Sequence, residues 1–497
     1  MLDIRSEQEF SARAQRVATS GPQIVPVLLA QLDQADSQYV GVLGVLASLY
    51  PDRQAIIEKL TSVAYDQTRP DRGRVSAILI LERFLDQEID PYLLNTLDNP
   101  QFMAVETIRE MMREGARNPR AWIEYTRSLV EQPPETIWDV MDTLLAVGGE
   151  QAVPALCLLA QEEREILSEA ALHTLGRIDH PAAAEGLRSI LPLLPPEPRT
   201  LAQRSLLKLQ LKQVLPDERP DPRGCWRTLV GPPDGHGYQV VWFSHAPDER
   251  GARKFLGLSL HEQAGIPQAY GNHNAAPDLV PEPLPLGQVH QVLLPVRSEE
   301  GLTGAQLLML ETDFEYGRRL VQAAQERAIE AGKRFPIEYR LMGPWLWRYA
   351  DPEGTAPSPP MPAAIRSVDR TAGAELLYHP AFRGWFAERE WLLRPARALL
   401  EQTPKGEGLP PGEIDRLARR YCDPETTVLL QGRLRAMVEW LQRAGQTRPA
   451  ALAWAAAQTL GDTPPERHPL VRAMVELGLQ ITVEQLRSPE RTNPRSL

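Results

Sequence analysis

One stretch decides the fold of the first 215 residues: Leu167-Ser168-Glu169-Ala170-Ala171-Leu172-His173-Thr174-Leu175-Gly176-Arg177-Ile178. Its apolar residues recur at helical spacing, and alanines stand in the middle, where a neighbouring helix must approach closely. The preceding segment carries Val153, Leu156 and Leu159 with the same period. Together these segments predict a pair of packed helices from Gly149 to Ile178.

A related segment recurs along the same part of the chain. It reads Pro-x-Leu-Leu or similar at residues 26–32, 91–97 and 154–160, and the prolines lie 65 and 63 residues apart. Proline is tolerated in the first turn of a helix, where its missing N–H has no intrahelical partner. Four helices fit into each interval, so the spacing predicts a repeating helix pair of roughly 32 residues.

The segment 167–178 resembles the second helix of a HEAT-like repeat of the phycobilisome-lyase type, with alanines in mid-helix and a Leu-Gly pair near the helix end. Residues 42–49, Val-Leu-Gly-Val-Leu-Ala-Ser-Leu, resemble a degenerate copy. The resemblance implies an α-solenoid over residues 1–215. The chromophore-handling residues of the lyases cannot be placed in this chain, so their activity is not carried over.

A solenoid fold suggests a function through its geometry. A helix pair that cannot bury its apolar face alone must stack on its neighbours, and the stacked pairs form a curved surface that commonly binds a partner. We therefore expect a non-enzymatic scaffold or adaptor that binds a protein partner on the solenoid surface.

The sequence predicts a small α+β domain at residues 216–350, which begins with the proline-rich segment 216–222. Strands are expected at 225–230 and 238–244, joined by a glycine-rich turn, and at 255–261 and 289–296. These four form an antiparallel meander. We expect the segment 265–287, rich in Pro, Gly and Asn, to be a long exposed loop, and the chain to be helical from Gly301 onward. The helix 314–331 has a wet face that carries Arg318, Arg319, Glu326 and Arg327.

Reactive side chains concentrate in this domain. An alternative function is an enzyme or metal-binding protein with a site near His245 and His261, in which His245, His261, Glu262 and His273 supply the ligands. The spacing matches no standard zinc signature, and the adjacent Ser244 and His245 would point to opposite faces of a strand. The catalytic residues therefore stay unknown, and exposed histidines are the simpler interpretation.

An aromatic cluster beside arginines ends the domain: Trp345, Trp347 and Tyr349 with Arg348. Such a cluster could stack bases or bind a proline-rich peptide, and it forms our candidate interaction patch. The alternative interpretation is packing between this domain and the next.

The remaining chain predicts a proline-rich linker at 351–375, a helical bundle at 376–487 and a disordered tail at 488–497. Helices are expected at 380–402, 411–420, 424–445, 448–460 and 468–478. Asp423 precedes Pro424 and is the expected N-cap of its helix. The whole chain is thus expected to be multidomain and mainly α.

Composition narrows the partners and the compartment. The 497 residues carry 65 acidic and 54 basic side chains, a formal charge of −11, which argues against broad nucleic-acid binding; binding through clustered arginines is the weaker alternative. Neither GxxxxGK[ST] nor GxGxxG is found, and no cofactor is indicated. The three cysteines are widely spaced, the N-terminus is polar, and we expect a cytoplasmic protein without a membrane span. The oligomeric state stays open.

Overall fold

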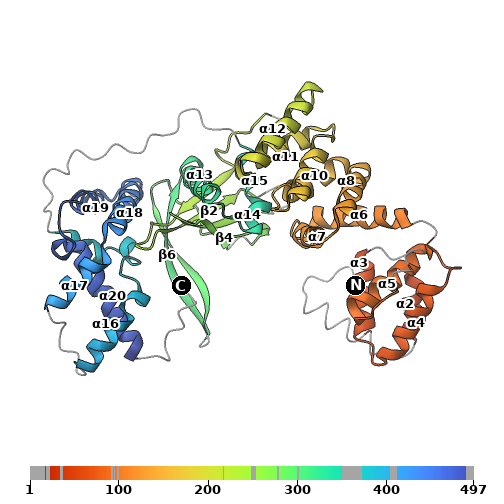
Figure 1. Ribbon diagram of the computed structural model, residues 1–497, viewed down its shortest axis with the longest axis horizontal. Helices are drawn as coiled ribbons and strands as arrows, with labels where there is room; N and C mark the ends of the chain where they lie inside the picture. The colour runs from red at the N-terminus through yellow and green to blue at the C-terminus, as the bar shows by residue number, and fades with distance from the viewer. Residues whose placement is uncertain are drawn as a thin grey trace. The chain divides into compact units, whose positions relative to one another are not determined.

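The computed structural model describes residues 17, 23–33, 37–90, 93, 96–97, 100–216, 218–247, 253–276, 279–298, 301–349, 372–402 and 411–487. The chain forms two compact units: Met1–Leu187 with Thr200–Pro216, here the helical unit, and Arg188–Arg199 with Asp217–Leu497, here the sheet unit. The described chain is mainly helical and contains one six-stranded antiparallel sheet (Figure 1).

The described part of the helical unit contains helices and no strand, as the sequence predicts. Its helices are α2 (Ile24–Gln31), α3 (Ser37–Ser48), α4 (Arg53–Tyr65), α5 (Asp71–Leu85), α6 (Pro100–Arg117), α7 (Ala121–Val130), α8 (Pro134–Gly148), the 3-10 turn η2 (Gly149–Ala152), α9 (Val153–Leu159) and α10 (Glu165–Leu175). Two further helices, α11 (Pro181–Ile190) and α12 (Pro196–Leu211), cross the boundary between the units, and the 3-10 turn η3 (Leu191–Leu193) belongs to the sheet unit.

The predicted helix pair at 149–178 is confirmed as α9 and α10. Val153, Leu156 and Leu159 of α9 are buried, as are Ala170 and Ala171 of α10. Pro154 stands in the first turn of α9 and Pro26 in the first turn of α2, where a missing N–H costs no hydrogen bond. Of the middle recurrent segment, 91–97, only residues 93, 96 and 97 are described.

One helical stretch among the described residues, Pro134–Leu159, is long and apolar enough to cross a membrane. It comprises α8, η2 and α9. Ile137, Met141 and Leu144 of α8 are buried inside the fold, as are most side chains of α9. Buried core helices share this length and composition, so the stretch is weak support for a membrane span.

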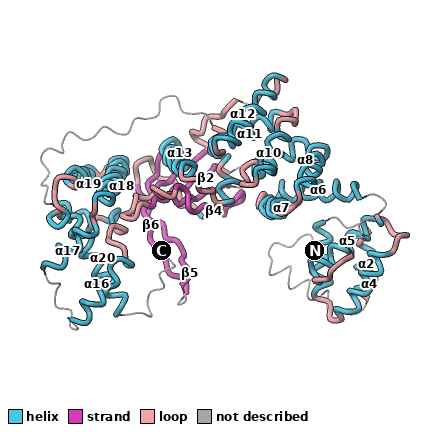
Figure 2. The backbone as a smooth tube through the Cα atoms, viewed as in Figure 1, coloured by secondary structure: helices cyan, strands magenta, loops and turns pink. Residues whose placement is uncertain are grey.

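The sheet has the strand order β4-β3-β2-β1-β6-β5, and all neighbours are antiparallel. Its strands are β1 (Trp226–Val230), β2 (Tyr238–His245), β3 (Arg253–His261), β4 (Gly265–Ala275), β5 (Val289–Ser298) and β6 (Gly301–Thr312). β5 and β6 pair along their whole length, whereas only residues 310–312 of β6 pair with β1. The β5–β6 hairpin therefore extends beyond the rest of the sheet (Figure 2).

Two expectations for this region are wrong. The expected loop 265–287 contains β4, which lies at the edge of the sheet, where Pro267 needs to donate no ladder hydrogen bond. The segment from Gly301, expected to be helical, forms β6, because it pairs with β5 on one side and β1 on the other. The meander of four strands is thus β1 to β4, and β5 and β6 complete a six-stranded sheet.

Alternation along the strands divides the sheet into two apolar faces. Val241 and Phe243 of β2 belong to the main core, whereas Trp242 between them belongs to a smaller cluster on the opposite face with Phe255. The main core includes residues of α13 (Phe314–Glu330), α14 (Ile337–Met342) and α15 (Pro344–Trp347). The expected helix at 314–331 is confirmed.

Helices after residue 371 complete the sheet unit. They are η6 (Ala372–Tyr378), η7 (Pro380–Phe382), α16 (Arg389–Gln402), α17 (Pro411–Tyr421), α18 (Pro424–Arg443), α19 (Thr447–Thr459), η8 (Pro465–Arg467) and α20 (Pro469–Arg487). The side chain of Asp423 accepts a hydrogen bond from the backbone N–H of Thr426, which confirms the expected N-cap of α18.

The expected helix 380–402 is wrong in its first part, because the α-helix begins only at Arg389. Trp385 lies before it, fully buried, and its indole donates a hydrogen bond of 3.0 Å to the backbone oxygen of Pro233. Most of the expected linker, together with the expected disordered tail, lies outside the described residues; residues 372–375 are part of η6.

Candidate functional site

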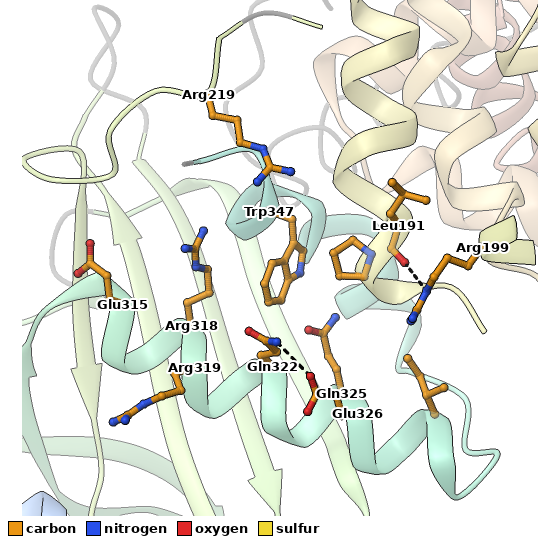
Figure 3. A pocket seen from close by; sticks show the side chains of 12 residues that line it. Leu191, Arg199, Arg219, Glu315, Arg318, Arg319, Gln322, Gln325, Glu326 and Trp347 are labelled. Carbon is orange, nitrogen blue, oxygen red and sulfur yellow. Dashed lines mark hydrogen bonds between the residues drawn. The ribbon is translucent and has the colours of Figure 1, made fainter. Parts of the chain in front are cut away.

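The sheet unit contains a pocket of about 540 Å³ beside the outer face of α13. This volume is within the usual range for small-molecule sites. Twelve residues line it: Leu191, Pro192, Arg199, Arg219, Glu315, Arg318, Arg319, Gln322, Gln325, Glu326, Ile329 and Trp347 (Figure 3). Seven of them lie on α13 at helical spacing and form one side of the pocket.

The position of α13 is fixed at its start and along its inner face. The Asp313 carboxylate caps the helix by accepting a hydrogen bond of 2.7 Å from the N–H of Tyr316. Gly317 lies against the sheet: a Cβ added there would be 2.4 Å from Thr228 Cγ2 and 3.0 Å from a ring carbon of Phe243. Because the inner face packs this closely, the opposite face of the helix is held rigidly along the pocket.

Basic side chains dominate the lining, with four arginines against two glutamates. Arg318 is buried, lies over the rings of Phe314 and Trp347 at 5.5 and 5.9 Å, and donates a hydrogen bond to the backbone oxygen of Tyr349. Arg199 is anchored by its Nε, which donates to the backbone oxygens of Leu191 and Leu194 at 3.1 Å. Arg319 pairs with Glu439 of α18. Four guanidinium groups therefore stand against three carboxylates, and the small excess of positive charge favours an anion.

Gln325 is the most unusual residue of the pocket. Its side chain is only 1% exposed, and neither its amide oxygen nor its amide nitrogen has a hydrogen-bond partner among the described residues. A buried polar group without a partner costs about 1–3 kcal/mol. Figure 3 shows the amide reaching from α13 toward Trp347 on the pocket side of the helix. The amide can therefore donate to and accept from a molecule in the pocket.

The pocket offers groups that can recognise an anion and a polar edge. Its twelve lining residues include two carboxylates, those of Glu315 and Glu326, and no histidine, cysteine, serine, threonine or aspartate. Guanidinium groups can bind a carboxylate or phosphate through paired hydrogen bonds, and an amide can read an adjacent polar edge. The predicted wet face of this helix is confirmed for Glu326 and Arg327, which are exposed, and is wrong for Arg318, which is buried over Phe314 and Trp347. Gln325 was not predicted, because its burial depends on the packing around it.

The structure separates the predicted metal ligands. His261 ends β3 and pairs with Tyr238 at the start of β2, whereas His245 ends β2 and pairs with Trp226 of β1. The length of β2 therefore separates the two histidines by about 23 Å at the usual rise of a strand. The rings of His245 and His273 contact different tryptophans, Trp226 at 4.9 Å and Trp345 at 4.6 Å. In the part of the chain that the structure describes, no group of three or more His, Cys, Asp or Glu residues could hold a metal ion.

Glu262 and His261 each have a structural partner. The Glu262 carboxylate accepts a hydrogen bond of 2.8 Å from Arg433 Nε of α18. His261 Nδ1 accepts hydrogen bonds from the backbone N–H groups of Gln263 and Ala264, and burial lowers the pKa of its imidazole. Both side chains therefore stabilise the turn between β3 and β4 and its contact with α18.

The predicted aromatic patch lies mostly inside the fold. Trp345 and Trp347 are buried in the main core, and Trp345 lies 6.5 Å from Trp226. The Tyr349 hydroxyl lies 3.2 Å from His245 Nε2, and only Arg348 of the four is exposed. These aromatic faces pack within the sheet unit, and Trp347 also forms part of the pocket lining.

A buried ionic cluster was not predicted from the sequence. Glu311 of β6 accepts hydrogen bonds of 3.0 and 2.8 Å from Arg227 of β1, and its Oε2 lies 2.7 Å from His290 Nε2 of β5. Burial alone would raise the pKa of Glu311, but the hydrogen bonds from Arg227 and His290 outweigh it and hold that pKa below its usual range. This cluster could not be predicted from the sequence, because β6 was expected to be a helix.

Comparison with known proteins finds no matching family, no matching curated protein and no matching solved structure.

Proposed function

We propose that the chain is a non-enzymatic adaptor whose N-terminal helices are HEAT-like hairpins that bind a protein partner. The observation that carries the proposal is a second apolar face on α12, the last helix of the helical unit. The C-terminal helices would form a bundle that, with the sheet, completes a multidomain, mainly helical protein.

The packing of two glycines supports the repeat interpretation. Gly44 of α3 and Gly176 at the end of α10 are the glycines of the two Leu-Gly pairs noted in the sequence. A Cβ at Gly44 would meet Phe84 of α5 at 2.4 Å, and one at Gly176 would meet Ser205 of α12 at 2.9 Å. In both cases the absence of a side chain at the glycine allows close packing against the helix two places further along the chain. Equivalent positions of a repeat would show the same relationship.

The exposed face of α12 supports partner binding. Ala202, Ser205 and Leu209 form its buried face, whereas Leu207 and Leu211, one turn apart on the opposite side, are 55% and 79% exposed. A single exposed leucine is ordinary, but leucines at i and i+4 on a helix form a stripe of the kind that binds an amphipathic helix. The stripe therefore has room for a partner.

Basic side chains accompany this stripe. Arg204 and Lys208 are exposed and lie on the same side of α12 as Leu207 and Leu211. An apolar stripe bordered by positive charge is complementary to an amphipathic helix with acidic flanks. We expect the partner to present such a helix.

The test is site-specific photo-crosslinking in the native host. A benzoylphenylalanine at Arg204 should produce one discrete adduct with another protein. The double substitution Leu207→Glu and Leu211→Glu, in the same tagged chain, should reduce that adduct at least tenfold. The matched control is Lys59→Glu, an exposed position on α4, which should leave the adduct unchanged.

Three outcomes would overturn the proposal. They are the absence of an adduct, an adduct that the double substitution leaves unchanged, and an adduct that contains only a second copy of this chain. Circular dichroism of the double variant should match the unsubstituted chain, because Leu207 and Leu211 are exposed and their replacement leaves the core intact.

A further inference from the structure

The pocket beside α13 combines two features that the adaptor role does not use. The first is the buried amide of Gln325, which has no partner among the described residues and lies on the pocket side of α13. The second is the group of four arginines on the same lining. An amide that is almost fully buried is normally hydrogen-bonded, so a group from outside the protein, a water molecule or a ligand, is needed to satisfy it.

The arginines identify one part of that group. Arg219 and Arg318 extend beside Trp347 in Figure 3, and Arg199 is held by the backbone of Leu191 and Leu194. The carboxylates of Glu315 and Glu326 also line the pocket, and Glu326 accepts a hydrogen bond from Gln322. Arg319 is also paired with Glu439 of α18. The four guanidinium groups still outnumber these three carboxylates, so the pocket favours an anionic group such as phosphate or carboxylate.

Gln325 identifies the other part of the molecule that the pocket would bind. A carboxamide donates and accepts at the same edge, and it pairs with a partner that presents an acceptor beside a donor. The edge of adenine has this pattern, and so does a primary amide.

We propose that this pocket binds a small organic anion in which a phosphate or carboxylate accompanies a donor–acceptor edge. The arginines hold the anion and Gln325 pairs with the edge. Two sources share this chemistry, a purine mononucleotide and an amide-bearing carboxylic acid. The proposal is independent of partner binding on α12, because none of the lining residues belongs to the exposed leucine stripe.

Isothermal titration calorimetry of the full chain tests the proposal with adenosine 5′-monophosphate and N-acetylglutamine as probes. At least one should bind at a single site with a Kd below 1 mM. Adenosine and ribose 5-phosphate, which each keep one half of the nucleotide, should bind at least tenfold more weakly than the nucleotide if it is the preferred probe. Acetamide and acetate are the corresponding fragments of N-acetylglutamine.

Two substitutions locate the binding. Gln325→Leu should raise the Kd of the probe at least tenfold. It should also raise the Tm of the unliganded chain, because it removes an unsatisfied buried amide. Arg219→Gln at the pocket edge should also weaken the probe at least tenfold. Its matched control is Arg327→Gln, the same change of charge on an exposed residue of α13 outside the pocket, which should change the Kd less than twofold.

Each contrary result overturns the inference. If neither probe binds below 1 mM, the pocket does not take this class of anion. If Gln325→Leu raises the Tm and leaves the Kd unchanged, water alone satisfies the amide. If Arg219→Gln and Arg327→Gln raise the Kd of the probe equally, the anion is attracted by the general surface charge and not by a specific site. Should Gln325→Leu fail to fold, the comparison between Arg219→Gln and Arg327→Gln still decides whether the anion binds in the pocket.

Discussion

The indole Nε1 of Trp440 in α18 donates a hydrogen bond of 2.8 Å to the backbone oxygen of Val230 in β1, across 210 positions of sequence. Both residues are buried in the main core. Nearby, Arg443 of the same helix bonds Asp313, the cap of α13, at 3.0 Å. One face of α18 therefore contacts the first strand of the sheet and the start of the helix that forms the pocket.

Replacing Trp440 with phenylalanine should destabilise the sheet unit. The ring keeps much of the apolar volume, but the oxygen of Val230 loses its buried donor, at a cost of about 1–3 kcal/mol. We expect a lower urea midpoint by circular dichroism and faster hydrogen exchange in peptides from β1 and α18.

Trp454→Phe is the control for this substitution. Trp454 lies in α19, is partly buried and packs against the same core. Trp454→Phe should lower the free energy of unfolding by less than Trp440→Phe, since the described residues show no hydrogen bond from the indole of Trp454. Equal losses for Trp440→Phe and Trp454→Phe would show that ring volume, and not the bond to Val230, determines the effect.

Glu311→Gln should change how stability depends on pH. The pKa of Glu311 is held below its usual value in the folded chain, so folding favours the charged carboxylate. Its contribution is complete above the unfolded pKa of about 4.5 and disappears as the pH falls through the folded pKa. At pH 7, losing the charge opposite Arg227 should cost about 3 kcal/mol.

The measurement is the urea midpoint at pH values from 7 to 3. The unsubstituted chain should lose more stability between pH 5 and pH 3 than Glu311→Gln does, so the two curves should converge in acid. Glu330→Gln, at an exposed carboxylate on α13, should give a curve parallel to that of the unsubstituted chain. A constant difference between the Glu311→Gln and unsubstituted curves would mean that the carboxylate does not titrate as the ionic cluster requires.

The parts of the fold that the sequence predicts are those with local signals. The strands at 226–230 and 238–245 are rich in β-branched and aromatic residues and flank a glycine-rich turn, and the helix from Phe314 has a clear helical period. β4 was missed because its Gly, Pro and Asn content is typical of a loop, and an edge strand tolerates such residues. β6 was missed because its strand conformation depends on pairing with β5 and β1.

The candidate site shows the same limit. Helical spacing assigned Glu326 and Arg327 correctly to the outer face of the helix, but it also predicted a solvated Arg318, which is buried. Nothing in the spacing distinguishes Gln325 from an exposed glutamine, since its burial is a property of the folded chain. The predicted ligands His245 and His261 are close in sequence, yet the antiparallel register pairs His261 of β3 with the start of β2, and His245 lies at its other end.

Gly317→Ala should separate α13 from the sheet. The added methyl group would lie 2.4 Å from Thr228 Cγ2 and would also meet Phe243, so the helix must shift or the core must repack. Overpacking of this kind costs about 1–3 kcal/mol, although alanine is the better helix former. The Tm of the sheet unit should fall, and binding of the pocket probe should weaken, since the outer face of α13 moves with the helix.

The matched control is Gly432→Ala in α18. Gly432 is exposed, and a Cβ there would meet no atom within 4 Å. The same substitution should therefore stabilise the chain by about 0.5–1 kcal/mol through helix propensity alone. Opposite signs of the change in Tm for the two variants support close packing of α13 on β1 and β2; a rise in Tm for both would contradict it, because helix propensity would then outweigh any contact of Gly317 with Thr228.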